Sequence, residues 1–245
     1  VFAPQTIDAS GEDALFPVRA AAGSYAIYDF GLATTGFVGL DLAAFGDAVI
    51  YLLWDEILSE GDVDYLRLQC SNVIKYELAA GNYRLQSFEP YTMRYLKVVV
   101  LGADCELRAV SVTGYRSGST VTARYASGDA RLNAVFAAAV ETYLQNSADL
   151  YMDCPSRERA GWHCDSYFLA RVEHCLTGAS AVERNFFENY LLPDSFAHLP
   201  EGMLPMCYPA DHPDGVFIPN WALWFVLQLE DFARRDPACD LPARL

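Results

Sequence analysis

A run of thirteen residues in the second half of the chain holds side chains suited to cleaving a glycosidic bond. It reads Asp153-Cys154-Pro155-Ser156-Arg157-Glu158-Arg159-Ala160-Gly161-Trp162-His163-Cys164-Asp165. Three carboxylates, two arginines and a tryptophan follow one another closely, and the proline prevents a simple helix from running through. Glycoside hydrolysis needs a carboxylic acid to protonate the leaving oxygen and carboxylates to stabilise the charged ring. The composition of this loop therefore predicts a sugar-cleaving site.

The same loop has a plainer interpretation. Charged loops are common, and Arg–Glu pairs often cap helices or form exposed ion pairs that contribute little to stability. An isolated tryptophan such as Trp162 belongs more often to a hydrophobic core than to a ligand site. Composition alone leaves both interpretations open, and the spacing of the residues decides between them.

The spacing Asp-Cys-Pro-x-Arg-Glu-Arg-x-Gly-Trp-x-x-Asp resembles, position by position, the signature of the bacterial α-L-rhamnosidases, which are inverting six-hairpin glycosidases. Some members carry one extra acidic residue between the first arginine and the glutamate, and this chain is similar to the shorter form. The resemblance implies that Glu158 is the general acid and that Asp153 and Asp165 bind sugar hydroxyls. It also implies that Arg157 orients a carboxylate or a hydroxyl and that Trp162 offers a ring face to the sugar. The implied substrate is a rhamnose-containing oligosaccharide or glycoside.

A general acid needs a raised pKa, which burial or neighbouring negative charge provides. Asp153 and Asp165 are placed to supply that charge to Glu158. Arg157 and Arg159 oppose it. The balance of these charges depends on how the loop folds.

Two further tryptophans lie three residues apart on a predicted helix and therefore share one face. We expect Trp221 to line the sugar site and Trp224 to pack in the core. Asn220, where that helix begins, is a candidate substrate contact. The preceding loop carries His198 and His212, for which exposure to solvent is the simpler expectation.

An inverting hydrolase also needs a second carboxylate that activates water on the opposite side of the sugar. In the family this glutamate lies in a later hairpin, and the acidic residues in the second half of this chain do not match its context. They are Glu173, Glu183, Glu188, Glu201 and Asp211. We therefore expect the chain to be a fragment of such an enzyme that carries the general acid and lacks the base.

Composition excludes several other classes of protein. Of the 245 residues, 53% are hydrophobic, which excludes a disordered chain, and no apolar run is long enough to cross a bilayer. The formal net charge of −15 argues against a nucleic-acid partner, because phosphate binding needs clustered lysines and arginines. We expect neither a membrane nor a nucleic acid among its partners.

The seven cysteines have no CxxC spacing and are expected to be free thiols. Free thiols favour a cytoplasmic location, although a periplasmic one stays open. A zinc site around His163, Cys164 and His174 is the weaker alternative, because the ligand spacing of structural sites is absent. No cofactor or metal is expected.

The first half of the chain predicts a jelly-roll-like β-sandwich domain over residues 1–117. Its short segments are aromatic and β-branched, several of them alternate polar and apolar residues, and glycine, asparagine, aspartate and proline separate them. The predicted strands are 25–30, 35–40, 48–54, 64–68, 73–78, 81–85, 94–100 and 107–112. Many short strands at regular intervals are typical of a sandwich.

After a linker at 117–120 the apolar residues follow helical spacing. Helices are predicted at 132–144, 165–176, 180–192 and 219–235, with a long loop at 193–217. Gly178 is the expected C-cap of the second helix, and Ser180 with Glu183 the expected capping box of the third. By the family resemblance, residues 121–245 form about two hairpins of an incomplete (α/α)6 six-hairpin catalytic toroid.

Two other functions stay open. The sandwich could be a non-catalytic carbohydrate-binding module that holds sugar on Tyr51, Trp54 and Tyr91. Alternatively, the chain could serve assembly, with the open ring docked on another chain. Sugar binding that survives removal of residues 121–245 would favour the first of these.

An incomplete ring leaves apolar faces of its helices uncovered. We expect parts of Phe186, Phe187, Trp221 and Phe225 to be exposed, and the chain to form a homo-oligomer through them, most simply a dimer. In the alternative arrangement the helices collapse on the sandwich and cover these faces within one chain.

Overall fold

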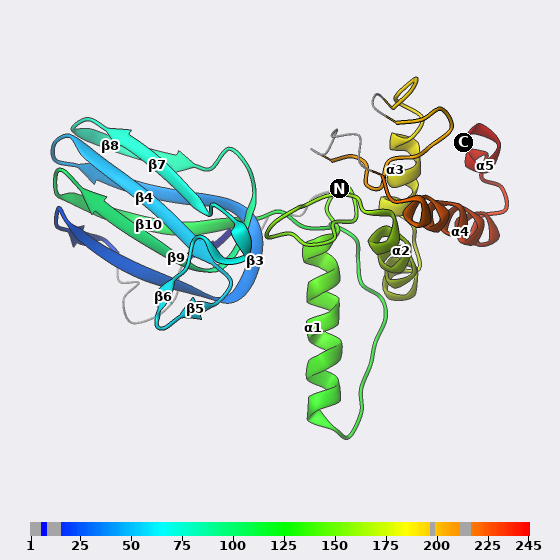
Figure 1. The fold of residues 1–245 in the computed structure, drawn as a ribbon. Coiled ribbons are helices and arrows are strands. Elements are labelled where there is room, and N and C mark those ends of the chain that lie inside the picture. Colours follow the sequence, from blue (N-terminus) through cyan, green and yellow to red (C-terminus); the bar gives the residue numbers. More distant parts are fainter. Residues whose placement is uncertain (1–5, 9–15, 197–198, 211–216) are drawn as a thin grey trace. The chain divides into compact units, whose positions relative to one another are not determined.

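A computed structural model describes residues 6–8, 16–196, 199–210 and 217–245 (Figure 1). The chain divides into two compact units, one that extends to Tyr115 and one from Arg116 to Leu245. The first consists of antiparallel strands and the second of helices and loops, so the predicted fold class is confirmed. Among the described residues, no helix is both long and apolar enough to span a membrane.

The first unit is an antiparallel sandwich whose two layers share the long strand β3 (Figure 1). Its strands are β1 Thr6–Asp8, β2 Val18–Ala20, β3 Ser24–Ala44, β4 Ala48–Asp55, β5 Leu58–Ser59, β6 Asp62–Val63, β7 Val73–Leu78, β8 Gly81–Gln86, β9 Tyr91–Leu101 and β10 Cys105–Gly114. One layer has the order β3-β9-β4-β7, and in the other β3 lies between β8 and β10. Strands β1 and β2 both pair with β10, and β5 pairs with β6.

β3 passes from one layer to the other at Gly36. Up to this residue the strand pairs with β9, and from it onwards the strand pairs with β10. A Cβ atom on Gly36 would lie 2.2 Å from the carbonyl oxygen of Thr113, so only glycine fits this crossing. Alternate side chains of both layers then point into one core, in which Leu42 and Ile50 are fully buried.

Most predicted strands are found. Those at 48–54, 73–78, 81–85, 94–100 and 107–112 correspond to β4, β7, β8, β9 and β10. Those at 25–30 and 35–40 are two parts of β3, which are separated by a shift in its register against β9. The sequence signal marks the segments and misses the continuity of the backbone between them.

The strand predicted at 64–68 is wrong. This segment is a turn that leads into one turn of 3-10 helix at Arg67–Gln69. The guanidinium of Arg67 donates to the buried carboxylate of Asp55 at 2.6 Å and to Glu56 at 3.1 Å. Leu68 has a φ of 56°, which a strand does not allow. Tertiary ion pairing therefore overrides the local alternation of apolar residues.

The helices of the second unit are α1 Ala130–Asn146, α2 His163–Thr177, α3 Ala181–Asn189, α4 Pro219–Arg235 and α5 Leu241–Arg244. The four predicted helices are confirmed, and the single turn of α5 was not predicted. Gly178 ends α2 in the left-handed conformation and donates its N–H to the carbonyl of His174 at 2.9 Å, as the sequence predicts. The third helix ends earlier than predicted, at Asn189, and continues as tight turns up to Leu192.

The predicted capping box at the start of α3 is wrong. The carboxylate of Glu173, which reaches across from α2, accepts the N–H groups of Val182 at 3.2 Å and Glu183 at 3.3 Å. Glu183 instead forms a buried ion pair with Arg235, which also donates to the hydroxyl of Ser180 at 2.9 Å. A carboxylate at a helix N-terminus satisfies free N–H groups and the helix dipole together.

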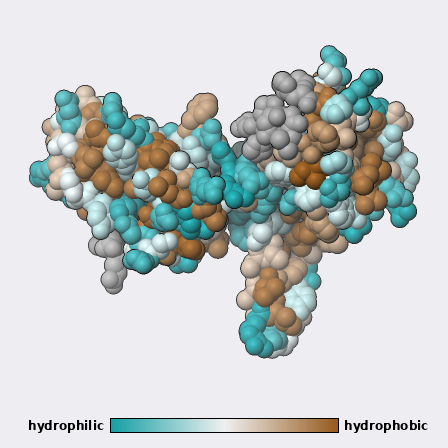
Figure 2. Space-filling model, in the orientation of Figure 1, coloured by the Kyte–Doolittle hydropathy of each residue, from teal (hydrophilic) through white to brown (hydrophobic). Residues whose placement is uncertain are grey.

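Three of the aromatic rings expected at an open face are buried inside the helical unit. Phe186 and Phe187 are 0% exposed and Phe225 is 5% exposed, because α3 and α4 pack them against Tyr190 and Phe232. Other apolar residues of this unit are exposed, and Figure 2 shows apolar surface here. On α1, α2 and α4 they include Leu132, Val135, Phe168, Val172, Leu223, Val226 and Leu227. The expected route to self-association through the buried rings is therefore wrong, and the oligomeric state itself stays a prediction.

Glu173 gives the first test of this packing. Replacing it by alanine leaves the amides of Val182 and Glu183 and the hydroxyl of Tyr151 without their buried acceptor. We expect Glu173→Ala to lower the free energy of unfolding of the helical unit by about 3 kcal/mol, measured by urea titration. The control is Glu188→Ala on α3, whose exposed ion pair with Arg184 predicts a loss of about 0.5 kcal/mol or less. Equal losses in the two variants would contradict the capping role.

Candidate active site

Residues 153–160, which carry Asp153 and Glu158, close into a loop through hydrogen bonds of their own. The N–H of Asp153 donates to the carbonyl of Ala160 at 3.2 Å, and the N–H of Ala160 donates back to Oδ1 of Asp153 at the same distance. Within this closure, the N–H of Arg159 donates to the carbonyl of Cys154 at 3.1 Å. Arg159 has a φ of 53°, the left-handed conformation that turns the chain back on itself. Asp153 and Glu158 therefore belong to a tight loop with its own hydrogen bonds.

Cys154 lies inside the loop and contacts two of the acidic residues. Its thiol is 3.0 Å from Oδ2 of Asp153, to which it donates, and its sulfur accepts the N–H of Glu158 at 3.4 Å. Burial, together with the hydrogen bond to Asp153, raises the pKa of this thiol. Cys154 thus stays a neutral donor that joins the side chain of Asp153 to the backbone of Glu158.

A second segment of the chain holds the loop from outside. The N–H of Gly161 donates to the carbonyl of Pro209 at 3.3 Å, and the N–H of Tyr208 donates to the carbonyl of Gly161 at 3.1 Å. Trp162 pairs with Cys207 in the same antiparallel manner. A Cβ atom on Gly161 would lie 2.6 Å from the carbonyl oxygen of Tyr208, so the close approach of the two backbones requires glycine.

The three acidic side chains interact through space. The pKa of Asp165 is raised, mainly by burial and further by the negative charges of Asp153 and Glu158. Asp165 lies in the first turn of α2, whereas the other two belong to the loop. Arg157 forms an ion pair with Glu158, and both side chains are partly exposed. Asp153 and Glu158 therefore lie near enough to Asp165 for their charges to raise its pKa.

The two tryptophans predicted to contact substrate share one apolar cluster. Trp162 and Trp221 both pack around the buried side chains of Ala160, Met206 and Cys207, and both residues are partly exposed. Trp162 follows the loop directly, whereas Trp221 comes from the first turn of α4. The cluster therefore joins α4 to the acidic loop.

Trp224 packs its ring on Tyr167 and Phe168 of α2 and is only partly buried, so it lies at the contact between α2 and α4 rather than inside the core. Asn220 is exposed at the start of α4. His198 and His212 lie outside the described residues. Among the described residues of α4, Trp221 packs against the cluster beside the loop.

His163 occupies a variable position of the motif, yet its side chain is fully buried. Its Nδ1 is 3.2 Å from the carbonyl oxygen of Trp221, and its Nε2 is hydrogen-bonded to the hydroxyl of Tyr190. Burial lowers the pKa of His163 to about 4, so the ring is neutral near pH 7. Its partners lie 58 and 27 residues away in the chain, so no local signal points to them.

The zinc alternative gains no support. Both ring nitrogens of His163 are hydrogen-bonded to protein partners. Among the described residues, no group of three or more histidine, cysteine, aspartate or glutamate side chains is arranged to hold a metal ion.

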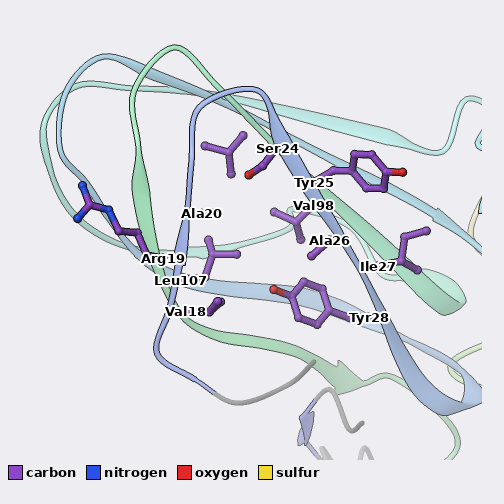
Figure 3. A pocket seen from close by; sticks show the side chains of 11 residues that line it. Val18, Arg19, Ala20, Ser24, Tyr25, Ala26, Ile27, Tyr28, Val98 and Leu107 are labelled. Carbon is purple, nitrogen blue, oxygen red and sulfur yellow. The ribbon is translucent and has the colours of Figure 1, made fainter. Parts of the chain in front are cut away.

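The sandwich contains a cavity of about 480 Å3 between β2 and β3 (Figure 3). Its lining includes the aliphatic side chains of Val98 and Leu107, and no carboxylate of the described chain lines it. Trp54, proposed from the sequence as a sugar platform, is 2% exposed and belongs to the core. Among the described residues, this cavity therefore lacks the acidic side chains that the loop carries.

Comparison with known proteins identifies relatives of the same architecture. Residues 121–232 match the family model described as the bacterial alpha-L-rhamnosidase 6 hairpin glycosidase domain. A rhamnosidase from Klebsiella oxytoca, solved with rhamnose bound, superposes with a TM-score of 0.78 at 21% identity, over 95% of this chain and 52% of that one. The family GH78 rhamnosidase of Bacillus sp. GL1 gives a TM-score of 0.72 at 23% identity, over 85% of this chain and 21% of that one.

A third similar structure is the α-L-rhamnosidase of Streptomyces avermitilis in complex with L-rhamnose. It gives a TM-score of 0.65 at 18% identity, over 84% of this chain and 20% of that one. No curated protein matches the chain. The chain thus spans about a fifth to a half of the length of these three rhamnosidases, and at these identities the likeness establishes the fold.

The backbones of Gly161 and Tyr208 approach so closely that adding one methyl group at Gly161 should destabilise the helical unit. Gly161→Ala should lower the free energy of unfolding of the helical unit by about 2 kcal/mol, because the new Cβ must push the Tyr208 backbone away. The control is Gly128→Ala, where a Cβ atom meets nothing within 4 Å. Denaturant titration of both variants checks this, and a Gly161→Ala variant as stable as the control would contradict the pinning of the loop.

Burial of His163 predicts a pH dependence of stability. The folded-state pKa of about 4 lies below the usual value of 6.5, so between these pH values the unfolded chain binds a proton that the folded chain does not. Neutral His163 therefore makes its full contribution to the free energy of unfolding above about pH 6.5. This contribution is lost as the pH falls towards 4, and the total loss is about 3 kcal/mol. Unfolding titrations across this range should show that His163→Gln has a smaller pH slope than the wild type. Identical slopes would contradict a buried neutral imidazole.

Proposed function

We propose that this loop is the acid side of an α-L-rhamnosidase site, because residues 121–232 match the family model of the bacterial alpha-L-rhamnosidase 6 hairpin glycosidase domain. The observation that carries the proposal is the acidic region of Asp153, Glu158 and Asp165, whose charges interact around one closed loop. Several carboxylates in one region are what glycosidic cleavage requires. The proposed substrate is a glycoside or oligosaccharide with a terminal α-L-rhamnose.

Glu158 is the proposed general acid, and the contacts of the three carboxylates support this choice. The oxygens of Asp153 accept the Ala160 amide and the Cys154 thiol, so they serve the loop itself. Asp165 is half-buried in the first turn of α2. Among the described residues, Glu158 forms an ion pair with the exposed side chain of Arg157, and its own side chain is 27% exposed. It is therefore the carboxylate best able to reach a glycosidic oxygen.

The remaining residues are proposed to hold the sugar. Asp153 and Asp165 would accept hydrogen bonds from hydroxyl groups, and Arg157 would donate to one of them once substrate displaces it from Glu158. Trp162 and Trp221 would offer ring faces to the apolar side of the sugar from their common cluster. Their partial exposure is compatible with this use.

We further propose that the complete enzyme acts with inversion and that this chain supplies only part of it. Inversion requires a second carboxylate about 6.5–9.5 Å from the acid, with a water molecule between them. Glu173 and Glu183, the fully buried acids of the helical unit, are engaged by α3 and by Arg235 and are unavailable for that role. The short span relative to the rhamnosidases above supports a base supplied by further helices.

Binding of L-rhamnose to the chain tests the site. Asp165→Asn should weaken binding about tenfold, because it removes a charged acceptor worth roughly 1.4 kcal/mol or more. Titration with L-rhamnose followed by NMR measures the dissociation constant. The matched control is Asp149→Asn, an exposed aspartate of the same unit outside the loop, which should leave binding unchanged. Equal affinity of both variants would refute the assignment.

Hydrolysis of an aryl α-L-rhamnoside tests the division of the site. A general acid or base contributes roughly 10²–10⁴-fold each, so the isolated chain should hydrolyse this substrate very poorly or not at all. Rapid turnover that Glu158→Gln abolishes would show instead that the chain contains its own base.

A further inference from the structure

His163 lies between the acidic loop and the predicted sugar platforms. It is the first residue of α2, directly after Trp162 and two residues before Asp165. Its backbone N–H donates to the carbonyl of Met206 at 3.3 Å, and its side chain is 0% exposed. Both its backbone and its side chain therefore contact the elements around the tryptophan cluster.

The hydrogen bonds of His163 determine its tautomer. A carbonyl oxygen can only accept, so the 3.2 Å contact between Nδ1 and the carbonyl of Trp221 requires the proton on Nδ1. The neutral ring then has its lone pair on Nε2, which accepts the hydroxyl proton of Tyr190. Each nitrogen therefore has a partner from a different element. Nδ1 bonds to Trp221 in α4, and Nε2 bonds to Tyr190, which directly follows α3.

Aromatic rings fix the plane of this imidazole. Phe186, Tyr190 and Phe225 surround it with ring centroids at 6.1, 5.5 and 5.6 Å. A ring held on these sides has little freedom to rotate, so its Nδ1–H keeps one direction. That direction fixes where the first turn of α4 lies relative to the first turn of α2.

We propose that His163 is a positioning residue of the sugar site, which holds Trp221 in place beside Trp162 through the Nδ1–H bond to the Trp221 carbonyl. This inference rests on the proposed function. Trp162 is covalently adjacent to His163, and the Trp221 ring packs on the same small cluster as Trp162. One side chain thus couples both platforms to the helix that carries Asp165.

Paired substitutions separate the two hydrogen bonds. An asparagine amide can occupy the place of Nδ1 and donate to the Trp221 carbonyl, whereas a glutamine amide reaches the place of Nε2 and serves Tyr190. Tyr190→Phe removes the hydroxyl and leaves the bond to Trp221 intact. If the bond to Trp221 positions the platform, His163→Asn and Tyr190→Phe keep L-rhamnose affinity within about threefold, and His163→Gln loses about tenfold or more.

The readout is the indole N–H spectrum of the 15N-labelled chain, titrated with L-rhamnose, together with the melting temperature of each variant. The chain has four tryptophans, and Trp54 in the sandwich is an internal reference. The Trp162 and Trp221 signals should move in His163→Gln and stay near their wild-type positions in Tyr190→Phe.

Three results would overturn the proposal. In the first, L-rhamnose affinity follows the melting temperature in all three variants. In the second, His163→Asn and His163→Gln lose equal affinity. In the third, Tyr190→Phe loses as much affinity as His163→Gln. If the wild-type chain shows no response to rhamnose, the proposed function fails. The indole positions of the variants then still decide whether His163 fixes Trp221.

Discussion

The arrangement of the site depends on one backbone contact, the antiparallel pairing of the segment after the acidic loop with residues 206–209. Gly161 exchanges hydrogen bonds with Tyr208 and Pro209, and the N–H of His163 donates to Met206. The approach at Gly161 is too close for any side chain. On one side of this pairing the chain forms the loop with Asp153 and Glu158, and on the other it begins α2. The pairing therefore fixes the loop acids relative to Asp165.

Buried carboxylates perform different tasks in the helical unit. Glu173 is compensated by Tyr151 and by the amides that begin α3, and Glu183 by Arg235. Buried ionic groups of this kind cost free energy unless their partners are well placed. The pKa of Asp165 is raised by burial and by its acidic neighbours, although a backbone hydrogen bond partly offsets this shift. Raised pKa values occur at functional sites and also at structural ion pairs such as that of Glu183, so the proposed role of Asp165 depends on its place beside the loop as well as on its pKa.

The sequence predicts what is local and misses what depends on distant partners. The motif is read from linear spacing, and the alternation in β4 and the Gly178 cap need only their neighbours in the chain. The capping of α3 by Glu173 cannot be read in this way, because a capping box at Ser180 is locally just as plausible. The role of His163 depends on its hydrogen bonds to Trp221 and Tyr190, which are distant in the sequence. The sequence suggests a sugar platform at Trp54, but in the folded sandwich this side chain is buried. The turn at 64–68 follows from the pairing of Arg67 with Asp55, which lies 12 residues earlier.

The most direct measurement of the central claim is a carbon-13 NMR titration of the Asp165 carboxyl group in the wild-type chain, Glu158→Gln and Asp153→Asn. If the three carboxylates share one site, the pKa of Asp165 is above its usual value of 3.8 in the wild type. It should then fall in each variant, because each loses a negative charge that opposes ionisation. A wild-type pKa at or below that value, or one that neither substitution changes, would contradict a shared acidic site.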